Sequence, residues 1–247
     1  MLIKTEAIVI RTSDYGESNK VLTVYTKDFG KLGMMARGAK KTKSRLSSVS
    51  QLFTHAHFLI QKGSGLGSLS QGEIINTFRG IKQDIIKTAY AAYMVELLDK
   101  VTDEHKPSPA LFEFLSLSLT YLEEDIDPDV LKAIFEMKML RLAGIGPQVD
   151  RCVLCGRKEG DFSFSISEGG FLCGQCRFSD ERAVALSSQT ARLLNLFYHI
   201  DLSRLGNVSV KKETKEMIAQ ILTTYIDEYS GIRLKSKRFL DQIQAFE

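Results

Sequence analysis

The sequence predicts a multidomain α+β protein in which a small five-stranded β-barrel is followed by an α-helical domain. Three observations predict this fold class. Residues 1–80 hold short β-branched or alternating segments separated by turn residues, residues 81–146 repeat apolar side chains at helical spacing, and four cysteines interrupt the helical part. The chain has 247 residues, of which 44% are hydrophobic, so it can bury one large core or several small ones.

Five strands are predicted in the first part of the chain. The second is rich in β-branched and aromatic residues, which favour strands. In the fourth, the residues follow a period of two, so that Thr54, Ala56 and Phe58 lie on one face of the strand and the residues between them lie on the other. The predicted strands begin at Ala7 and cover 21–26, 31–36, 52–60 and 68–78, with turns at 14–17 and 27–30 and a glycine-rich loop at 63–67. Short strands with turn signals between them are typical of a small barrel.

Helices are predicted from residue 81 onward. Apolar residues recur every fourth position between Ile81 and Leu97, as in an amphipathic helix. A later helix has clear end signals, because Asp127 can cap it, Pro128 suits its first turn and Gly144 suits its end. The predicted helices span 81–97, 111–122, 128–143, 188–200, 211–229 and 236–246. We therefore expect domains at 1–80 and 81–247, the second interrupted by a cysteine motif at about 150–180.

Charge is distributed unevenly along the chain. The net charge is +3, yet residues 1–80 carry 12 basic and 5 acidic side chains, whereas residues 81–150 carry 7 basic and 13 acidic ones. This asymmetry indicates a basic N-terminal module that binds a polyanion, although ordinary fluctuation of charge is the alternative. The sequence has no apolar run of about 18 residues, and charges interrupt its amino end, so we expect a soluble cytoplasmic protein without membrane contact.

The four cysteines predict a structural metal site. They form two Cys-x-x-Cys pairs with seventeen residues between them, which is the spacing of a tetrahedral thiolate zinc site. Between the pairs, Phe162 and Phe164 alternate with polar residues and predict a small hairpin. Four thiolates leave no open position, so we expect one structural Zn²⁺ per chain, with redox dithiols and unrelated cysteines as alternatives. The predicted ligands are Cys152, Cys155, Cys173 and Cys176.

A basic segment lies between the third and fourth predicted strands. It holds five cations in nine residues and no acid, together with Gly38, which permits close backbone approach to phosphate. An oligonucleotide-binding (OB) barrel holds single strands in such a groove. Five aromatic residues nearby could offer stacking faces, although most of them are expected in the core: Tyr15, Tyr25, Phe29, Phe53 and Phe58. A solvated charged loop is the alternative. The candidate DNA contacts here are Arg37, Lys40, Lys41, Lys43 and Arg45.

A second cationic run lies near the carboxyl end. Its side chains could add phosphate contacts, or they could only favour the end of a helix electrostatically. The candidate residues are Arg233, Lys235, Lys237 and Arg238.

Several enzyme classes have no signature in this chain. The sequence contains no G-x-x-x-x-G-K-[ST] phosphate loop, no G-x-S-x-G elbow and no H-E-x-x-H, and the acids between 123 and 129 suit a helix end better than a metal site. We therefore expect a binding protein and not an enzyme, with a zinc-ribbon nucleic-acid-processing enzyme or a protein-interaction scaffold as alternatives. A surplus of large apolar residues predicts an exposed partner groove in 81–146, with a plain bundle core as the alternative; these residues are Phe112, Phe114, Leu117, Met137 and Met139.

The order of these features resembles the bacterial RecO family of recombination mediators and DNA repair proteins. The residues that carry the resemblance extend along the whole chain. They are Asp14-Tyr15-Gly16-Glu17 with Thr26 and Gly30, Ala36-Arg37-Gly38-Ala39-Lys40 leading to Ser44, Leu142, Gly144 and Pro147 before Cys152, and Gly231 with Leu234-Lys235-Ser236.

The resemblance implies a function that the spacing of residues does not. A family member would bind single- and double-stranded DNA, promote strand annealing and, with RecR, load RecA onto DNA covered by single-strand-binding protein. It would also contact the C-terminal tail of that protein, and it would be associated with the nucleoid when bound to DNA. Zinc cysteines are not universal in the family, so the resemblance implies a structural site that is not needed for function.

Overall fold

The chain forms two compact units. The computed structural model describes residues 1–63, 65–206 and 208–244. The first unit comprises Met1–Asp125 together with Leu234–Glu247, and the second comprises Ile126–Arg233. The predicted domains, 1–80 and 81–247, divide the chain differently and stay a prediction.

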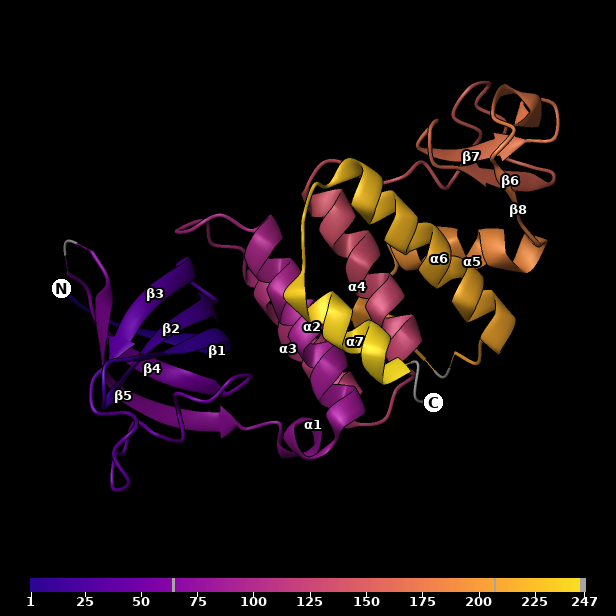
Figure 1. Cartoon of the computed structure of the whole chain (residues 1–247). Helices are drawn as coiled ribbons and strands as arrows, with labels where there is room; N and C mark the ends of the chain where they lie inside the picture. Colours follow the sequence, from indigo (N-terminus) through magenta and orange to yellow (C-terminus); the bar gives the residue numbers. More distant parts are fainter. Residues whose placement is uncertain (64, 207, 245–247) are drawn as a thin grey trace. The chain divides into compact units, whose positions relative to one another are not determined.

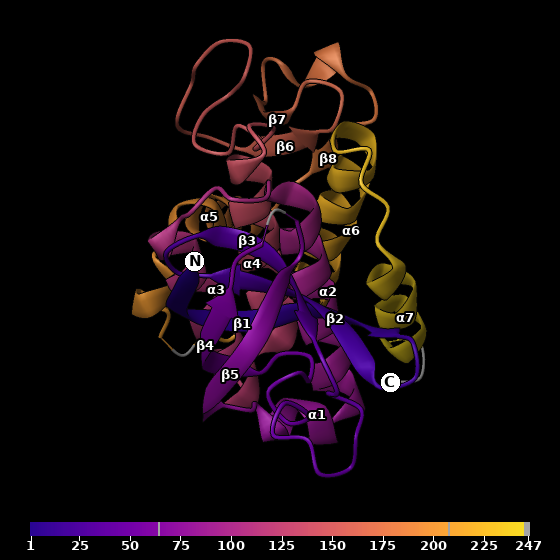
Figure 2. The ribbon, with the colours of Figure 1, turned by 90° about the vertical axis from the view of Figure 1, so that its left-hand side faces the viewer.

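The first unit begins with a closed five-stranded barrel (Figure 1), which confirms the predicted α+β fold class with an OB-like barrel. Its strands are β1 (Leu2–Tyr15), β2 (Asn19–Thr26), β3 (Gly30–Ala36), β4 (His55–Gln61) and β5 (Gly67–Asn76). They follow the order β1-β2-β3-β5-β4, and antiparallel pairing of β1 with β4 closes the ring. Figure 2 shows the five strands around a common interior. Alternate side chains fill that interior, among them Val9, Leu22, Met34 and Phe58.

Several predicted elements differ from the structure. The first strand begins at Leu2 and not at Ala7, because Leu2 to Ile8 pair with β4. The fourth strand begins at His55 and not at residue 52, because Phe53 adopts a φ of +66°, which interrupts extended backbone. The helix predicted over 81–97 is two helices, because Asp84 is extended between them (φ −114°, ψ 119°). Its carboxylate caps the second helix by accepting hydrogen bonds from the N–H groups of Ile86 and Lys87.

The described part of the first unit also contains four helices. They are α1 (Arg79–Gln83), α2 (Ile85–Val101), α3 (Pro109–Glu123) and α7 (Lys235–Gln244). The C-terminal helix α7 packs on α2, although the two lie far apart in the sequence. Residues 245 and 246 of the helix predicted over 236–246 lie outside the described residues.

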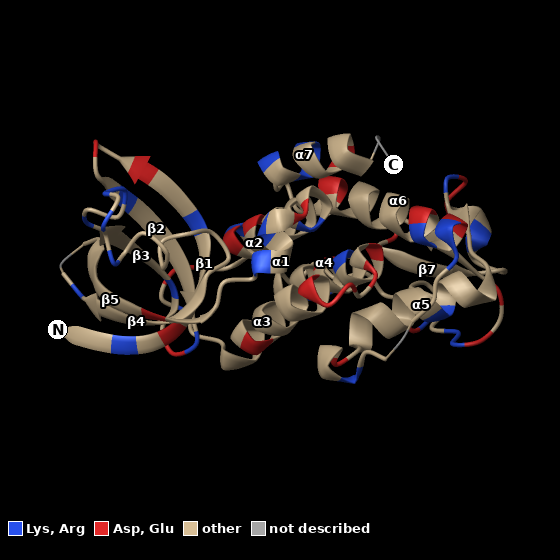
Figure 3. Cartoon of the chain, turned by 90° about the horizontal axis from the view of Figure 1, so that it is seen from below, with Lys and Arg blue, Asp and Glu red and all other residues tan. Residues whose placement is uncertain are grey.

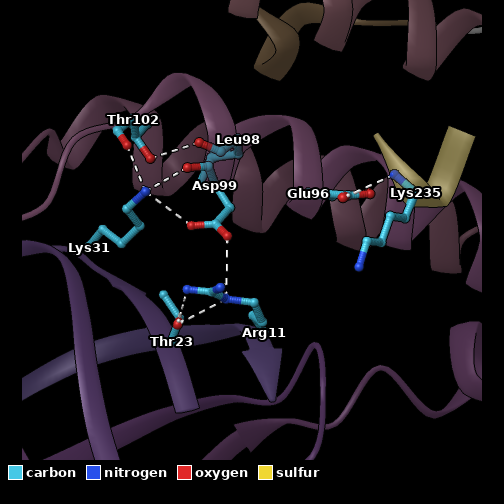
Figure 4. A network of polar contacts seen from close by, with 8 residues as sticks. All are labelled: Arg11, Thr23, Lys31, Glu96, Leu98, Asp99, Thr102 and Lys235. Atoms are coloured by element: carbon cyan, nitrogen blue, oxygen red, sulfur yellow. Dashed lines mark hydrogen bonds and ion pairs between the residues drawn. The ribbon is translucent and has the colours of Figure 1, made fainter. Parts of the chain in front are cut away.

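A polar network joins the barrel to α2 (Figure 4). The buried Lys31 forms an ion pair with the carboxylate of Asp99 at 3.0 Å. Its ammonium also donates to the main-chain oxygens of Asp99 at 2.5 Å and Thr102 at 2.7 Å, which lie at the carboxyl end of the helix. Arg11 reaches the same carboxylate at 3.5 Å and donates to the hydroxyl of Thr23. These contacts stabilise the docking of the barrel on the helix.

The second unit combines helices with a small sheet. Its helices are α4 (Pro128–Leu142), α5 (Ser188–His199) and α6 (Lys212–Tyr229), and its strands are β6 (Phe162–Ser165), β7 (Gly170–Cys173) and β8 (Val184–Ala185). Asp127 caps α4 by accepting from two main-chain N–H groups, and Lys215 forms ion pairs with Asp127 at 2.9 Å and Asp129 at 3.0 Å. The acids at this position therefore act at a helix end, as the sequence predicts.

Four of the five large apolar residues singled out in 81–146 are core. Phe112, Met137 and Met139 are at most 1% exposed, and Phe114 is buried as well. The prediction that these side chains form an exposed groove is therefore wrong for these four, whereas Leu117 is half-buried. None of the described helices combines the length and the apolar character that crossing a membrane requires.

Candidate metal centre and nucleic-acid interface

The four predicted metal ligands converge. The sulfur atoms of Cys152, Cys155, Cys173 and Cys176 all lie within 4.8 Å of one another. The Sγ atoms of Cys155 and Cys173 are 3.6 Å apart, which is too far for a disulfide. Tetrahedral zinc with Zn–S bonds of about 2.3 Å requires sulfurs about 3.8 Å apart, so the cluster fits such an ion.

Two short turns place these sulfurs. In the first, the N–H of Gly156 donates to the carbonyl of Cys152 at 2.9 Å, and Gly156 has a φ of +72°, which favours glycine. In the second, the N–H of Cys176 donates to the carbonyl of Cys173, also at 2.9 Å. The predicted hairpin between the pairs is β6 and β7, and the hydroxyl of Tyr229 in α6 donates to the carbonyl of Ile166 in its turn at 2.6 Å.

The thiols have strongly divided acidities. Burial opposes ionisation of Cys152, yet main-chain N–H groups around its sulfur lower its pKa to about 6. The hydrogen bond with Cys155, together with burial, raises the pKa of Cys176 to about 12. Sulfurs this close repel one another when ionised, so a bound cation is what allows all four to be thiolates. The cluster could therefore hold a metal ion.

The basic segment lies on the surface of the barrel, between β3 and β4. All five predicted cations are exposed, and the main chain around them forms successive turns. Lys40 forms an ion pair with Asp14 at 2.7 Å, and the hydrogen bond that it donates lowers the pKa of Asp14. Within the described part of the chain, no carboxylate pairs with the other four, Arg37, Lys41, Lys43 and Arg45. Lys and Arg recur in the barrel loops beside β2 and β3 (Figure 3).

The turn between β1 and β2 supports the start of this segment. Gly38 has a φ of +68°, and its N–H donates to the side-chain oxygen of Asn19 at 2.8 Å. The N–H of Lys40 donates to the carbonyl of Ser18 at 2.9 Å. The sequence pattern identifies the cations but gives no signal for Asn19, because Asn19 lies 19 positions before Gly38, to which it is hydrogen-bonded.

Three of the four C-terminal cations lie on one helix. Lys235, Lys237 and Arg238 belong to α7, whereas Arg233 precedes the helix and belongs to the second compact unit. The main-chain N–H of Lys235 donates to Glu96 at 3.1 Å, and its ammonium points away from that carboxylate (Figure 4). Lys237 forms an ion pair with Asp241 at 3.3 Å.

Comparisons with known proteins agree with both parts of this architecture. A family model described as "Recombination protein O N terminal" matches residues 1–78, and one described as "Recombination protein O C terminal" matches residues 82–238. The chain belongs to the RecO family. It is 54% identical to the DNA repair protein RecO of Bacillus subtilis over 247 residues, which cover 100% of this chain and 97% of that protein. It is 52% identical to the DNA repair protein RecO of Bacillus cytotoxicus, with 100% of both chains covered.

Membership of the RecO family indicates a role in DNA repair. The match to the N-terminal model covers the barrel and its basic segment, and the match to the C-terminal model covers the cysteine cluster and the three cations of α7. The resemblance that the sequence suggests is therefore confirmed over the whole chain.

Proposed function

We propose that the chain is a DNA-binding recombination mediator that holds single- and double-stranded DNA against the basic segment of its barrel. The observation that carries this proposal is the exposure of Arg37, Lys41, Lys43 and Arg45 on an OB-like barrel, with no carboxylate paired to them among the described residues. Exposed cations of this kind bind phosphates through Coulomb attraction and release of counterions. The cations of α7, of which Lys235 and Arg238 are exposed, and Arg233 before the helix are candidates for additional phosphate contacts.

Strand annealing follows from the same chemistry. Two complementary strands repel each other through their phosphates, and a protein that neutralises both backbones lets them pair. Membership of the RecO family supports the further steps. The protein would act with RecR to load RecA onto DNA covered by single-strand-binding protein, and it would contact the C-terminal tail of that protein.

The cysteine cluster is proposed to hold one structural Zn²⁺. The four sulfurs fit a tetrahedral thiolate ion, and four thiolates leave no site for a water molecule. Zinc would supply only cohesion here, by joining the turn at 152–155 to the turn at 173–176.

The main alternative is a nucleic-acid-processing enzyme, which would need carboxylates that converge beside the basic segment. Asp14 forms an ion pair with Lys40, and Asp28 accepts a hydrogen bond from Thr5 at 3.0 Å. These contacts favour structural roles for both acids. A protein-interaction scaffold is the other alternative, and it leaves the exposed cations without a purpose.

One incubation separates these functions. The protein is mixed with labelled single-stranded DNA and Mg²⁺, without nucleotide, and the DNA is followed on native and denaturing gels. The proposal expects a retarded band with intact DNA and, after addition of the complementary strand, faster duplex formation than in protein-free solution. Cleaved DNA would indicate an enzyme, and unretarded DNA would indicate a scaffold.

A further inference from the structure

We propose that Tyr15 is a base-stacking platform beside the basic segment, which gives the barrel a contact specific to single-stranded nucleic acid. The inference rests on the proposed function, because it assigns a second kind of contact to the same surface. Cations bind the phosphates of single and double strands alike, whereas an exposed ring can stack only on a base that is free of its partner.

Tyr15 differs from the other rings of the barrel in its exposure. It is 59% exposed, although it lies in a unit whose large side chains mostly form the core. Of the six Phe and Tyr rings within residues 1–63 and 65–78, the other five are buried or half-buried: Tyr25, Phe29, Phe53, Phe58 and Phe78. Those five are therefore core residues, and Tyr15 alone among the six keeps most of its surface available to a ligand.

The backbone holds Tyr15 close to the cations. It is the last residue of β1, where it pairs with Asn19 across the turn to β2. Three contacts bind this turn to the basic segment: Asn19 accepts from the N–H of Gly38 at 2.8 Å, Ser18 accepts from the N–H of Lys40 at 2.9 Å, and Asp14 pairs with the ammonium of Lys40 at 2.7 Å. The backbone that carries Tyr15 and the basic segment are therefore held together by hydrogen bonds and an ion pair.

Charge around the ring favours a nucleic acid as the occupant. Two acids lie at the end of β1 and in the turn that follows it. Asp14 in the strand is paired with Lys40, and Glu17 in the turn is outnumbered by the cations of the basic segment. A partner segment that is apolar and uncharged would gain nothing from this surplus of positive charge. A single strand would place its phosphates against the cations and a base on the ring, as proteins that bind single strands without sequence preference do.

The first test compares variants at Tyr15 by fluorescence anisotropy. Tyr15→Ala should weaken binding of a single-stranded oligonucleotide about 5- to 150-fold, because loss of one stacked base costs that much, and it should weaken duplex binding much less. The slope of affinity against salt should not change, since no phosphate contact is lost. Tyr15→Phe should bind within about twofold of the parent protein, because the ring remains. Phe178→Ala is the matched control, since Phe178 is 87% exposed but lies beside the cysteine cluster.

The second test reads the contact directly. The chain contains no tryptophan, so Tyr15→Trp introduces a single indole whose emission reports on its surroundings. Stacking predicts that a saturating single strand quenches this emission and that an oligonucleotide with abasic residues quenches it much less. Unchanged single-strand affinity in Tyr15→Ala, or unchanged emission of Tyr15→Trp at saturation, would overturn the inference. Normal DNA binding by a variant without the five cations would instead overturn the proposed function, and the stacking proposal with it.

Discussion

The buried lysine between the barrel and α2 offers a sharp test of how the first unit is held together. Lys31→Met keeps most of the apolar stem but removes the ammonium. The change leaves the carboxylate of Asp99, 12% exposed, without its 3.0 Å partner and removes hydrogen bonds from two carbonyls at the end of α2. Removing one member of a buried pair costs about 3–5 kcal/mol. Because Arg11 still reaches Asp99 at 3.5 Å, we expect a loss near the lower limit, about 3 kcal/mol.

Hydrogen exchange is the suitable assay, because a chain with two compact units need not unfold in one step. Amides of α2 should exchange about 100-fold faster in Lys31→Met at equal pH and temperature. Lys100→Met is the matched control, since Lys100 is exposed near the end of the same helix, and it should change stability by less than about 0.5 kcal/mol. The double variant Lys31→Met, Asp99→Leu should lose less than the single one, because no buried charge is left unpaired. Equal protection of α2 in Lys31→Met and Lys100→Met would refute the reasoning.

Three further outcomes are expected. Purified protein should contain about one zinc ion per chain by mass spectrometry of metals. Cys176→Ser should lower the zinc content and destabilise the fold around the cysteines. Metal-free protein whose cysteines are freely alkylated would contradict the proposed zinc site. Burial lowers the pKa of His55 despite its hydrogen bond to Glu6. Below about pH 6.5 the unfolded state therefore binds more protons than the folded state, and stability falls as the pH drops. In His55→Gln, the midpoint of urea unfolding should depend less on pH between about pH 7 and about pH 5.5 than in the parent protein. Gly30→Ala should destabilise the first unit by about 2 kcal/mol or more in urea unfolding, because Gly30 has a φ of +68° and a Cβ there would collide with the carbonyl oxygen of Lys106. Wild-type stability of this variant would show that the segment between α2 and α3, which contains Lys106, can move aside.

Local signals explain how much of the fold could be predicted. The limits of α4 follow from Asp127 and Pro128, whose preferences act within one turn of the helix. The spacing of the cysteines equally predicts that their sulfurs converge, because each pair is a short turn and the hairpin between the pairs brings the turns together.

Contacts between residues far apart in the sequence explain what could not be predicted. Counting charges treats Lys31 as one of the cations available to a polyanion, whereas it is buried against Asp99, 68 residues away. His55 has no acid near it in the sequence, yet the pairing of β1 with β4 places Glu6 at 2.8 Å. The exposure of Tyr15 also depends on the closed barrel, because only packing shows which rings the core uses.

The most direct test of the proposed function is the salt dependence of DNA binding. A variant in which the five cations of the basic segment are neutral should stay folded, because these exposed side chains contribute little to the core. Its affinity for single strands should fall about equally for all sequences, and the slope of log affinity against log salt should flatten by about 0.7 for each lost phosphate contact. Fluorescence anisotropy measures both quantities, with circular dichroism as the folding control. A folded variant with unchanged affinity and slope would contradict this account and leave the cations of α7 as the next candidate.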